Sequence, residues 1–207
     1  MDIQLAIDRI SIEKAVSLIK EVQGNVDMVE IGTSLIKEFG IDVVREIRRQ
    51  FPNLKILADI KTIDQAEYEF RMVYEAGADV ATVMGASAIE SIEVCQKICQ
   101  EMKKEYMIDL LEVTADRIKE LKVFEDAWFC IHLPADKTGT NLESLVSLAV
   151  AELKPMSKIA VAGGITLKHL PFLIENDVSL AIIGGAITKS RDVGLSAKQF
   201  ADYLGKG

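Results

Sequence analysis

The sequence is poor in the residues that mark several protein classes. It has only 3 cysteines and 4 prolines in 207 residues, and it contains no segment rich in proline or serine. An odd number of cysteines without a Cys-x-x-Cys pair is typical of reduced thiols rather than of a disulfide framework. We therefore expect Cys95 and Cys99, which are four residues apart, to pack on one face of a helix.

Long apolar runs and an excess of positive charge are also missing. No apolar run approaches the roughly 18 residues that a membrane span needs, and Met1-Asp2-Ile3-Gln4 is not a basic region followed by an apolar stretch. The net charge of -8 argues against nucleic acid and anionic membrane surfaces as partners. These absences predict a cytoplasmic protein without nucleic-acid or membrane partners, although a phosphorylated small molecule could bind through local groups.

What the sequence does contain is a regular alternation of short apolar runs and longer stretches with helical spacing. The spacing of the runs, about 25 residues, is the length of one strand-plus-helix unit, and eight such units predict a single (β/α)8 TIM barrel over residues 1–207. A doubly wound open sheet is the alternative architecture of this α/β class. The eight runs begin near Ile3, Met28, Lys55, Val80, Glu105, Ala127, Lys158 and Leu180.

Helix boundaries have their own signals. Side chains that commonly cap helices predict helix starts at Ser11, Ser91 and Thr114. Gly40, Gly77 and Gly139 fall where helices should end or loops should turn.

The stretch Leu57-Ala58-Asp59-Ile60-Lys61-Thr62-Ile63-Asp64 places charged residues where an apolar strand would be expected to continue. Side chains two apart in a strand share a face, so Asp59 and Lys61 should point the same way. If that face is the barrel interior, the two charges meet at the carboxyl end of the strand, where barrel enzymes carry their chemistry. The alternative is a solvated ion pair at the surface.

Other predicted strands also end in polar side chains. A barrel brings these ends into one ring, so the carboxylates there should outnumber the cations. Like charges about 4 Å apart repel by roughly 4 kcal/mol at an effective dielectric constant near 20, and a bound cation would relieve this repulsion. Oxygen ligands from separate strands favour Mg²⁺ over Zn²⁺. The residues concerned are Asp8, Glu30 with Thr33 just beyond, Asp59, Asp109 and His132.

Glycine pairs stand at the ends of the last two predicted strands. Gly163-Gly164 and Gly184-Gly185 allow a close approach to the backbone, and helix starts expected at Thr166 and Thr188 would offer N–H groups to an anion. The loops after strands seven and eight are the usual phosphate site of a TIM barrel. A phosphate site opposite a metal with acid and base groups predicts a phosphorylated polyol or keto sugar as the ligand.

These motifs resemble the orotidine-phosphate-decarboxylase superfamily and, within it, the 3-hexulose-6-phosphate synthases. The resemblance covers the whole chain and rests on Asp8, Glu30-Ile31-Gly32-Thr33, Asp59-x-Lys61-x-x-Asp64, Ala162-Gly163-Gly164 and Ile183-Gly184-Gly185. Orotidine-phosphate decarboxylases normally have Ile-Pro-Asn-Thr after the second aspartate, whereas Gln65-Ala66-Glu67-Tyr68-Glu69 follows Asp64. The 3-keto-L-gulonate-6-phosphate decarboxylases have glutamate in place of Asp109 and arginines after the histidine. One departure from the synthases is Leu133-Pro134-Ala135-Asp136-Lys137, where they usually have Thr-Gly-x-Asp-x-Gln.

The resemblance implies a Mg²⁺-dependent lyase that condenses formaldehyde with D-ribulose 5-phosphate, through an enediolate, to 3-hexulose 6-phosphate. Glu30 and Asp59 would ligate the metal, and Lys61, His132, Asp59 and Asp64 would be catalytic. The residues implied in substrate binding are Asp8, Thr33, Asp109, Gly163, Gly164, Gly184 and Gly185. A decarboxylase that gives L-xylulose 5-phosphate and a sugar-phosphate-binding barrel without turnover are the alternatives.

The family also shares active sites across a homodimer, which implies that Asp64 completes the site of the partner. Asp64 lies past the strand end, where it cannot easily reach its own barrel mouth. The nearby apolar residues Leu35, Ile36, Phe39 and Ile63 should be exposed unless a partner covers them. The alternative is that Asp64 caps the following helix.

Overall fold

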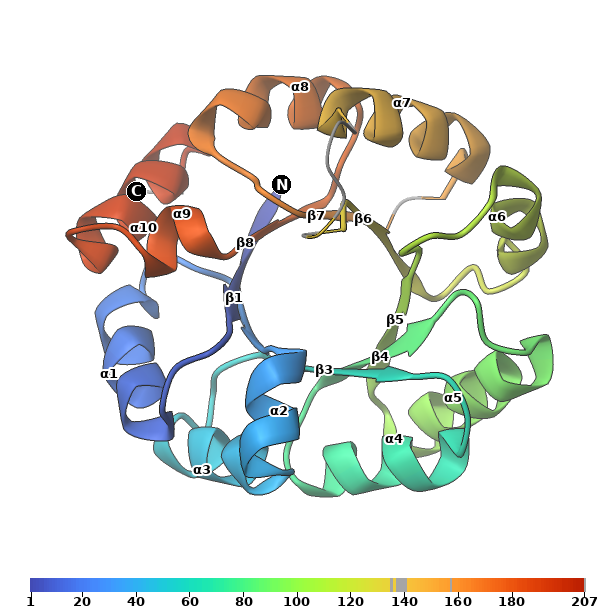
Figure 1. The fold of residues 1–207 in the computed structure, drawn as a ribbon, viewed down its shortest axis with the longest axis horizontal. Helices are drawn as coiled ribbons and strands as arrows, with labels where there is room; N and C mark the ends of the chain where they lie inside the picture. Colours follow the sequence, from blue (N-terminus) through green and yellow to red (C-terminus); the bar gives the residue numbers. More distant parts are fainter. Residues whose placement is uncertain (135, 137–140, 157, 207) are drawn as a thin grey trace.

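The strands of the computed structural model form a closed, parallel eight-stranded barrel inside a ring of helices (Figure 1). The structure describes residues 1–134, 136, 141–156 and 158–206, so Gly139 lies outside the described residues. Each strand pairs with the next along the chain, and β1 pairs with β8, which confirms the TIM barrel and excludes the open sheet. The strands are β1 (Asp2–Ile7), β2 (Met28–Ile31), β3 (Ile56–Thr62), β4 (Val80–Met84), β5 (Glu105–Asp109), β6 (Trp128–His132), β7 (Ile159–Ala162) and β8 (Leu180–Ile183).

The helices follow the strands around the ring. They are α1 (Ile12–Val22), α2 (Thr33–Phe39), α3 (Asp42–Gln50), α4 (Ala66–Glu75), α5 (Ile89–Met102), α6 (Ala115–Leu121), α7 (Leu142–Leu153), the 3-10 turn η1 (Leu167–His169), α8 (Leu170–Glu175), α9 (Gly185–Thr188) and α10 (Val193–Tyr203). No helix in the described part of the chain is long and apolar enough to cross a membrane.

Two of the three predicted helix starts are confirmed. The hydroxyls of Ser11 and Thr114 accept the N–H groups three residues further on, both at 3.3 Å. The start at Ser91 is wrong, because its N–H already donates to the carbonyl of Ala88 at 3.1 Å and α5 begins at Ile89. Gly40 ends α2 with φ +67°, a conformation that glycine adopts without steric cost.

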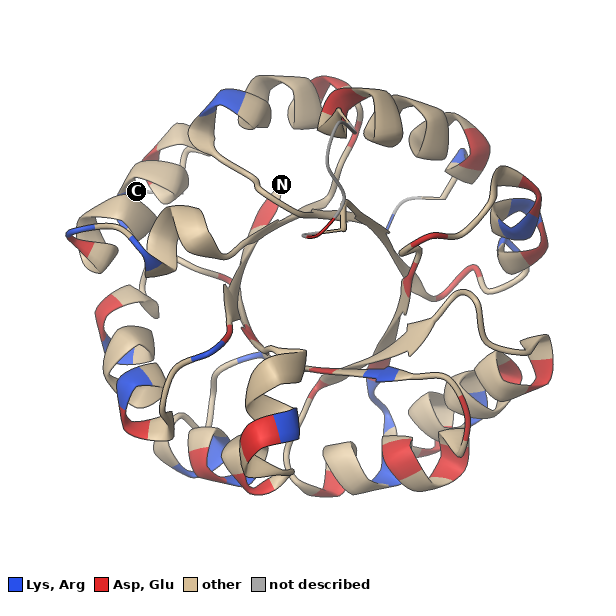
Figure 2. Cartoon of the chain, viewed as in Figure 1, with Lys and Arg blue, Asp and Glu red and all other residues tan. Residues whose placement is uncertain are grey.

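The alternation of side chains along each strand creates two apolar layers. Outward residues pack under the helices, whereas a smaller inner cluster fills the bore with residues such as Met28, Leu57, Val80 and Met107. Most charged residues lie on the outer helices and in loops (Figure 2). The buried exceptions, Glu30, Asp59 and Asp109, lie towards the carboxyl ends of their strands, so the barrel buries charge mainly at its mouth.

Strand β3 departs from regular geometry where it enters the mouth. Its register with β4 shifts between Ala58 and Thr62, and Lys61 has a left-handed φ of +49°. Such a conformation costs a non-glycine residue roughly 1–2 kcal/mol. The irregular end of β3 lets the Lys61 side chain reach the same cavity as Asp59, and backbone strain of this kind is concentrated at functional sites.

Candidate active site

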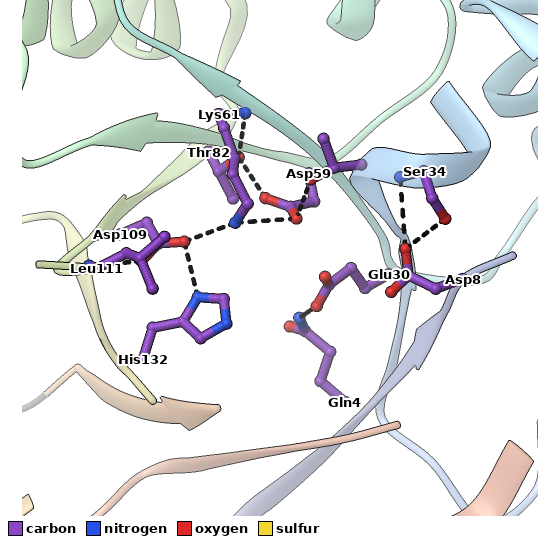
Figure 3. A network of polar contacts seen from close by, with 11 residues as sticks. Gln4, Asp8, Glu30, Ser34, Asp59, Lys61, Thr82, Asp109, Leu111 and His132 are labelled. Carbon is purple, nitrogen blue, oxygen red and sulfur yellow. Dashed lines mark hydrogen bonds and ion pairs between the residues drawn. The ribbon is translucent and has the colours of Figure 1, made fainter. Parts of the chain in front are cut away.

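A cavity of about 680 Å³ opens at the carboxyl ends of the strands. Side chains from β1, β2, β3 and β6 and the loops after β7 and β8 line it, and they include Asp8, Glu30, Asp59, Lys61 and His132. Figure 3 shows the polar groups of this mouth. The predicted residues that the structure brings together around this cavity are Asp8, Glu30, Thr33, Asp59, Lys61, His132 and the four glycines 163, 164, 184 and 185.

Lys61 is held between two carboxylates. Its Nζ lies 3.1 Å from Oδ2 of Asp59 and 2.7 Å from Oδ2 of Asp109 (Figure 3). Burial alone would lower the pKa of Lys61, but the charges of Asp59 and Asp109 outweigh it and raise the pKa. Lys61 is therefore an ammonium ion at neutral pH, fixed in position as a positive charge and not as a base.

Asp109 links this lysine to the histidine. Its Oδ2 lies 2.9 Å from Nδ1 of His132, and its Oδ1 accepts the N–H of Leu111 at 2.9 Å. Although burial would raise the pKa of Asp109, the hydrogen bond from His132 and the charge of Lys61 lower it to about 2. Because an ionised carboxylate can only accept, Nδ1 of His132 carries a proton, which leaves Nε2 as the available base.

Two threonines fix the carboxylate of Asp59. The hydroxyl of Thr33, at the start of α2, donates to Oδ2 at 2.6 Å, and that of Thr82 on β4 donates to Oδ1 at 2.9 Å. Thr82 also accepts the backbone N–H of Lys61 at 2.9 Å. Thr33, predicted to bind substrate, thus orients Asp59, while Thr82 was missed because a β-branched residue is unremarkable in a strand.

Glu30 is the most perturbed carboxylate of the mouth. Burial first, and then the negative charge of Asp59, raise its pKa to about 8. The amide of Gln4 donates a hydrogen bond to Oε2 of Glu30, while Oε1 of Gln4 is fully buried without a hydrogen-bond partner among the described residues. An orphaned buried acceptor beside the carboxylates of Glu30 and Asp59 is a polar site that fits a cation with a bound water.

The oxygen-rich surroundings of Glu30 and Asp59 fit Mg²⁺. Carboxylate oxygens from two strands, with an amide carbonyl beside them, are donors that a hard cation prefers. Bound Mg²⁺ would remove the repulsion that raises the pKa of Glu30, and a water on the ion could donate to Oε1 of Gln4. Sequence reasoning missed Gln4, although it lies in phase with Ala6 and Asp8 on the inner face of the first strand.

Asp8 sits at the rim, against the start of α2. Its Oδ1 accepts the hydroxyl of Ser34 at 2.6 Å, and a Cβ on Gly32 would lie only 2.3 Å from that oxygen. Gly32 is therefore needed for the close approach of Asp8 to α2. Ser34 was not predicted, because its partner is 26 residues away in the sequence.

The two glycine pairs, which follow β7 and β8, also line the cavity. Gly163 has φ +104°, and a Cβ there would lie 2.5 Å from the carbonyl oxygen of Leu133, so only glycine fits. Thr166 precedes η1, as predicted. The helix start predicted at Thr188 is wrong: the N–H groups of Ile187 and Thr188 already donate to the carbonyl of Gly184 at 3.0 Å, so α9 begins at Gly185 and ends at Thr188.

Asp64 lies away from the mouth. It lines a second cavity, of about 880 Å³, together with residues of α4 and α5, and its Oδ1 accepts the N–H of Gln65 at 2.8 Å. That bond is outside the pattern of a helix cap, which would accept from the second or third residue of α4. The expected exposure of Leu35 is wrong, because it is fully buried in its own core, whereas Ile63 is 55% exposed. Ile36 and Phe39 also pack against the core of their own chain.

The closed barrel and its acid–base mouth define a TIM-barrel enzyme, and comparisons with known proteins identify the family. The sequence profile of the orotidine 5'-phosphate decarboxylase / HUMPS family matches residues 1–200. A curated 3-hexulose-6-phosphate synthase from Bacillus subtilis (strain 168) is 35% identical over 210 residues, with complete coverage of both chains. The chain therefore belongs to the orotidine 5'-phosphate decarboxylase / HUMPS family.

Solved structures agree with this assignment. A crystal structure of a 3-hexulose-6-phosphate synthase superposes with a TM-score of 0.90 at 31% identity and covers 98% of this chain and 99% of that one. A 3-keto-L-gulonate-6-phosphate decarboxylase from Vibrio cholerae O1 has a TM-score of 0.80 at 25% identity, with 97% of each chain covered. The barrel is thus common to both activities, and the mouth residues must distinguish between them.

Proposed function

We propose that this protein is a cytoplasmic, Mg²⁺-dependent 3-hexulose-6-phosphate synthase, which joins formaldehyde to D-ribulose 5-phosphate. That it is a lyase-type enzyme follows from its family and its full-length relatives. The observation that carries the finer proposal is the chain of contacts from Asp59 through Lys61 and Asp109 to His132. This chain places a fixed positive charge beside an oriented base. Free, buried cysteines fit a reducing compartment.

The reaction needs a base at C1 of the sugar and a positive charge at the oxygen of C2. Nε2 of His132 would remove a proton from C1, and the electron pair of that C–H bond would form the enediolate. The enediolate carbon then attacks formaldehyde, which forms one C–C bond and places the electrons of the formaldehyde C=O on its oxygen. The proton on His132 returns to that oxygen, so the reaction is balanced without an oxidant or reductant.

Lys61 supplies charge during this step. An ammonium group fixed by two carboxylates needs no reorganisation when the enediolate oxygen becomes negative, which is the property of an effective electrostatic stabiliser. Mg²⁺ held by Glu30 and Asp59 would act as a Lewis acid on the oxygens of the sugar. The glycine pairs 163–164 and 184–185 would bind the phosphate through backbone N–H groups.

Exchange of the C1 proton in D2O tests the role of His132 without formaldehyde. With Mg²⁺ present, the protein should exchange one C1 proton of D-ribulose 5-phosphate, as followed by NMR, and His132→Asn should slow the exchange at least about 100-fold. The chain's other histidine, His169, provides the control, because it accepts the N–H of Thr166 in a capping box and His169→Gln retains that acceptor. Equal exchange in His132→Asn would remove His132 from this role.

We also propose that the working unit is a homodimer in which Asp64 completes the site of the partner. This proposal is supported by the position of Asp64 in a cavity other than its own mouth and by the exposure of Ile63 beside it. Mixing inactive Asp64→Ala with inactive Lys61→Ala protein should create heterodimers with one intact site and restore about a quarter of the wild-type activity. Mixtures that stay inactive despite demonstrated subunit exchange would refute the shared site.

A further inference from the structure

We propose that Asp109, Cys130 and His132 form a second metal site, one that binds a thiophilic divalent cation such as Zn²⁺ and switches the enzyme off. This site is distinct from the pair Glu30 and Asp59. Metal binding by the three residues is independent of the proposed synthase activity, whereas the inhibition rests on it.

Strand geometry brings the three ligands together. Asp109 is the register partner of Cys130 across the β5–β6 ladder, and Cys130 and His132 are two residues apart on β6. All three side chains therefore face the bore. A carboxylate oxygen, the sulfur and a ring nitrogen lie within 4.8 Å of one another, so small side-chain movements would bring them to the distances of a tetrahedral Zn²⁺ site, about 2.0–2.3 Å from the ion.

The donor set selects for the metal. One sulfur, one nitrogen and one carboxylate oxygen are ligands of Zn²⁺ and Co²⁺, while Mg²⁺ prefers oxygen alone. Three protein ligands leave a fourth position open, as in many reactive zinc sites. Cys130 is only 3% exposed, and its thiol has no role in the proposed synthase reaction. On binding, the metal–sulfur bond forms as the S–H bond breaks, and the proton is released to solvent.

Occupation of this site would dismantle the catalytic contacts. Both oxygens of Asp109 are in use, because Oδ2 contacts Lys61 at 2.7 Å and His132 at 2.9 Å, and Oδ1 accepts from Leu111. A dication on Asp109 would repel the ammonium of Lys61 and take the place of its ion pair. It would also ligate His132 and break the hydrogen bond of this ring with Asp109, so the positive charge and the base would be lost together.

Co²⁺ reports thiolate ligation directly, through the charge-transfer absorption that a sulfur–cobalt bond produces. The experiment titrates Co²⁺ into Mg²⁺-loaded wild-type protein, Cys130→Ala, Cys130→Ser and, as the matched control, Cys95→Ala, which removes a buried thiol from α5. The absorption should appear in the wild type and in Cys95→Ala and be absent from both Cys130 variants. Two Cys130 variants are used because a substitution at this buried position can prevent folding, and one variant that folds is enough for the test.

Inhibition supplies the second readout. Zn²⁺ should abolish wild-type turnover, a tenfold increase in Mg²⁺ should not restore it, and a Cys130 variant should need at least about tenfold more Zn²⁺ for half-inhibition. The site is disproved if the wild type shows no cobalt–thiolate absorption or if Cys130 variants retain it. Inhibition that excess Mg²⁺ reverses, or that is equal in the Cys130 variants, would overturn the switch and place Zn²⁺ at Glu30 and Asp59 instead.

Discussion

Glu30 makes the stability of the metal-free protein depend on pH in an unusual direction. Its pKa is raised from 4.5 to about 8 by burial and by the charge of Asp59. Between these values the folded protein keeps a proton on Glu30 that the unfolded chain has lost. Because the native state binds more protons, its free energy of unfolding falls as the pH rises through this window and levels off above pH 8.

The size of the effect follows from the two pKa values. One pH unit corresponds to about 1.4 kcal/mol for one proton, so the full window corresponds to about 5 kcal/mol. Because Asp59 shares the repulsion with Glu30, the effect of Glu30 alone is smaller. We expect the free energy of unfolding to fall by at least about 2 kcal/mol between pH 5 and pH 8. For a chain of this length that equals a fall in melting temperature of roughly 4–8 °C.

Calorimetry of metal-free wild type and Glu30→Gln measures this effect. Between pH 5 and pH 8 the melting temperature of the wild type should fall by about 4–8 °C more than that of the variant, which carries no ionisable group at this position. Asp109 does not affect this comparison. Because its pKa is lowered to about 2, its contribution to the free energy of unfolding changes only at acid pH, where stability is lost as the pH falls. Excess Mg²⁺ should prevent the fall in the melting temperature of the wild type at pH 8. Parallel curves for the two proteins would refute the account of Glu30.

Three further perturbations test other parts of the site. Removing divalent ions with a chelator should abolish turnover and Mg²⁺ should restore it, whereas full activity in metal-free protein would exclude the metal. Lys61→Ala should lower kcat at least about 100-fold without unfolding the barrel, and an increase in KM alone would show that Lys61 contributes only to substrate binding. Gln4→Leu should weaken Mg²⁺ binding, measured by calorimetric titration, by about 10–100-fold; unchanged affinity would remove Gln4 from the metal site.

The period of two along strands predicted most of the mouth. Asp8, Glu30, Asp59, Asp109 and His132 stand at the same phase of successive strand–helix units, so closing the barrel brings them together. For Lys61 the alternation is only part of the reason, because the register shift and a left-handed φ of +49° also determine where its side chain lies. Such irregularities are not visible in a hydrophobic pattern.

The partners of the charged groups were harder to predict. Gln4 and Thr82 contact carboxylates 26 and 23 residues away in the sequence, and neither residue type is unusual in a strand. Local signals also failed where tertiary contacts decide the outcome. The expected exposure of Leu35 ignored that the first turn of α2 packs onto the barrel, and the expected helix start at Thr188 ignored that the carbonyl of Gly184 already accepts two helical N–H groups.

The central claim is that the mouth joins formaldehyde to D-ribulose 5-phosphate. The most direct measurement is to incubate Mg²⁺-loaded protein with ¹³C-formaldehyde and D-ribulose 5-phosphate and to follow the label by NMR. We predict equimolar loss of both substrates and appearance of the label at C1 of 3-hexulose 6-phosphate, at a rate at least about 100-fold lower in Lys61→Ala. If free formaldehyde persists in this incubation and the protein releases CO2 from 3-keto-L-gulonate 6-phosphate in a parallel one, the claim is contradicted and the protein is a decarboxylase.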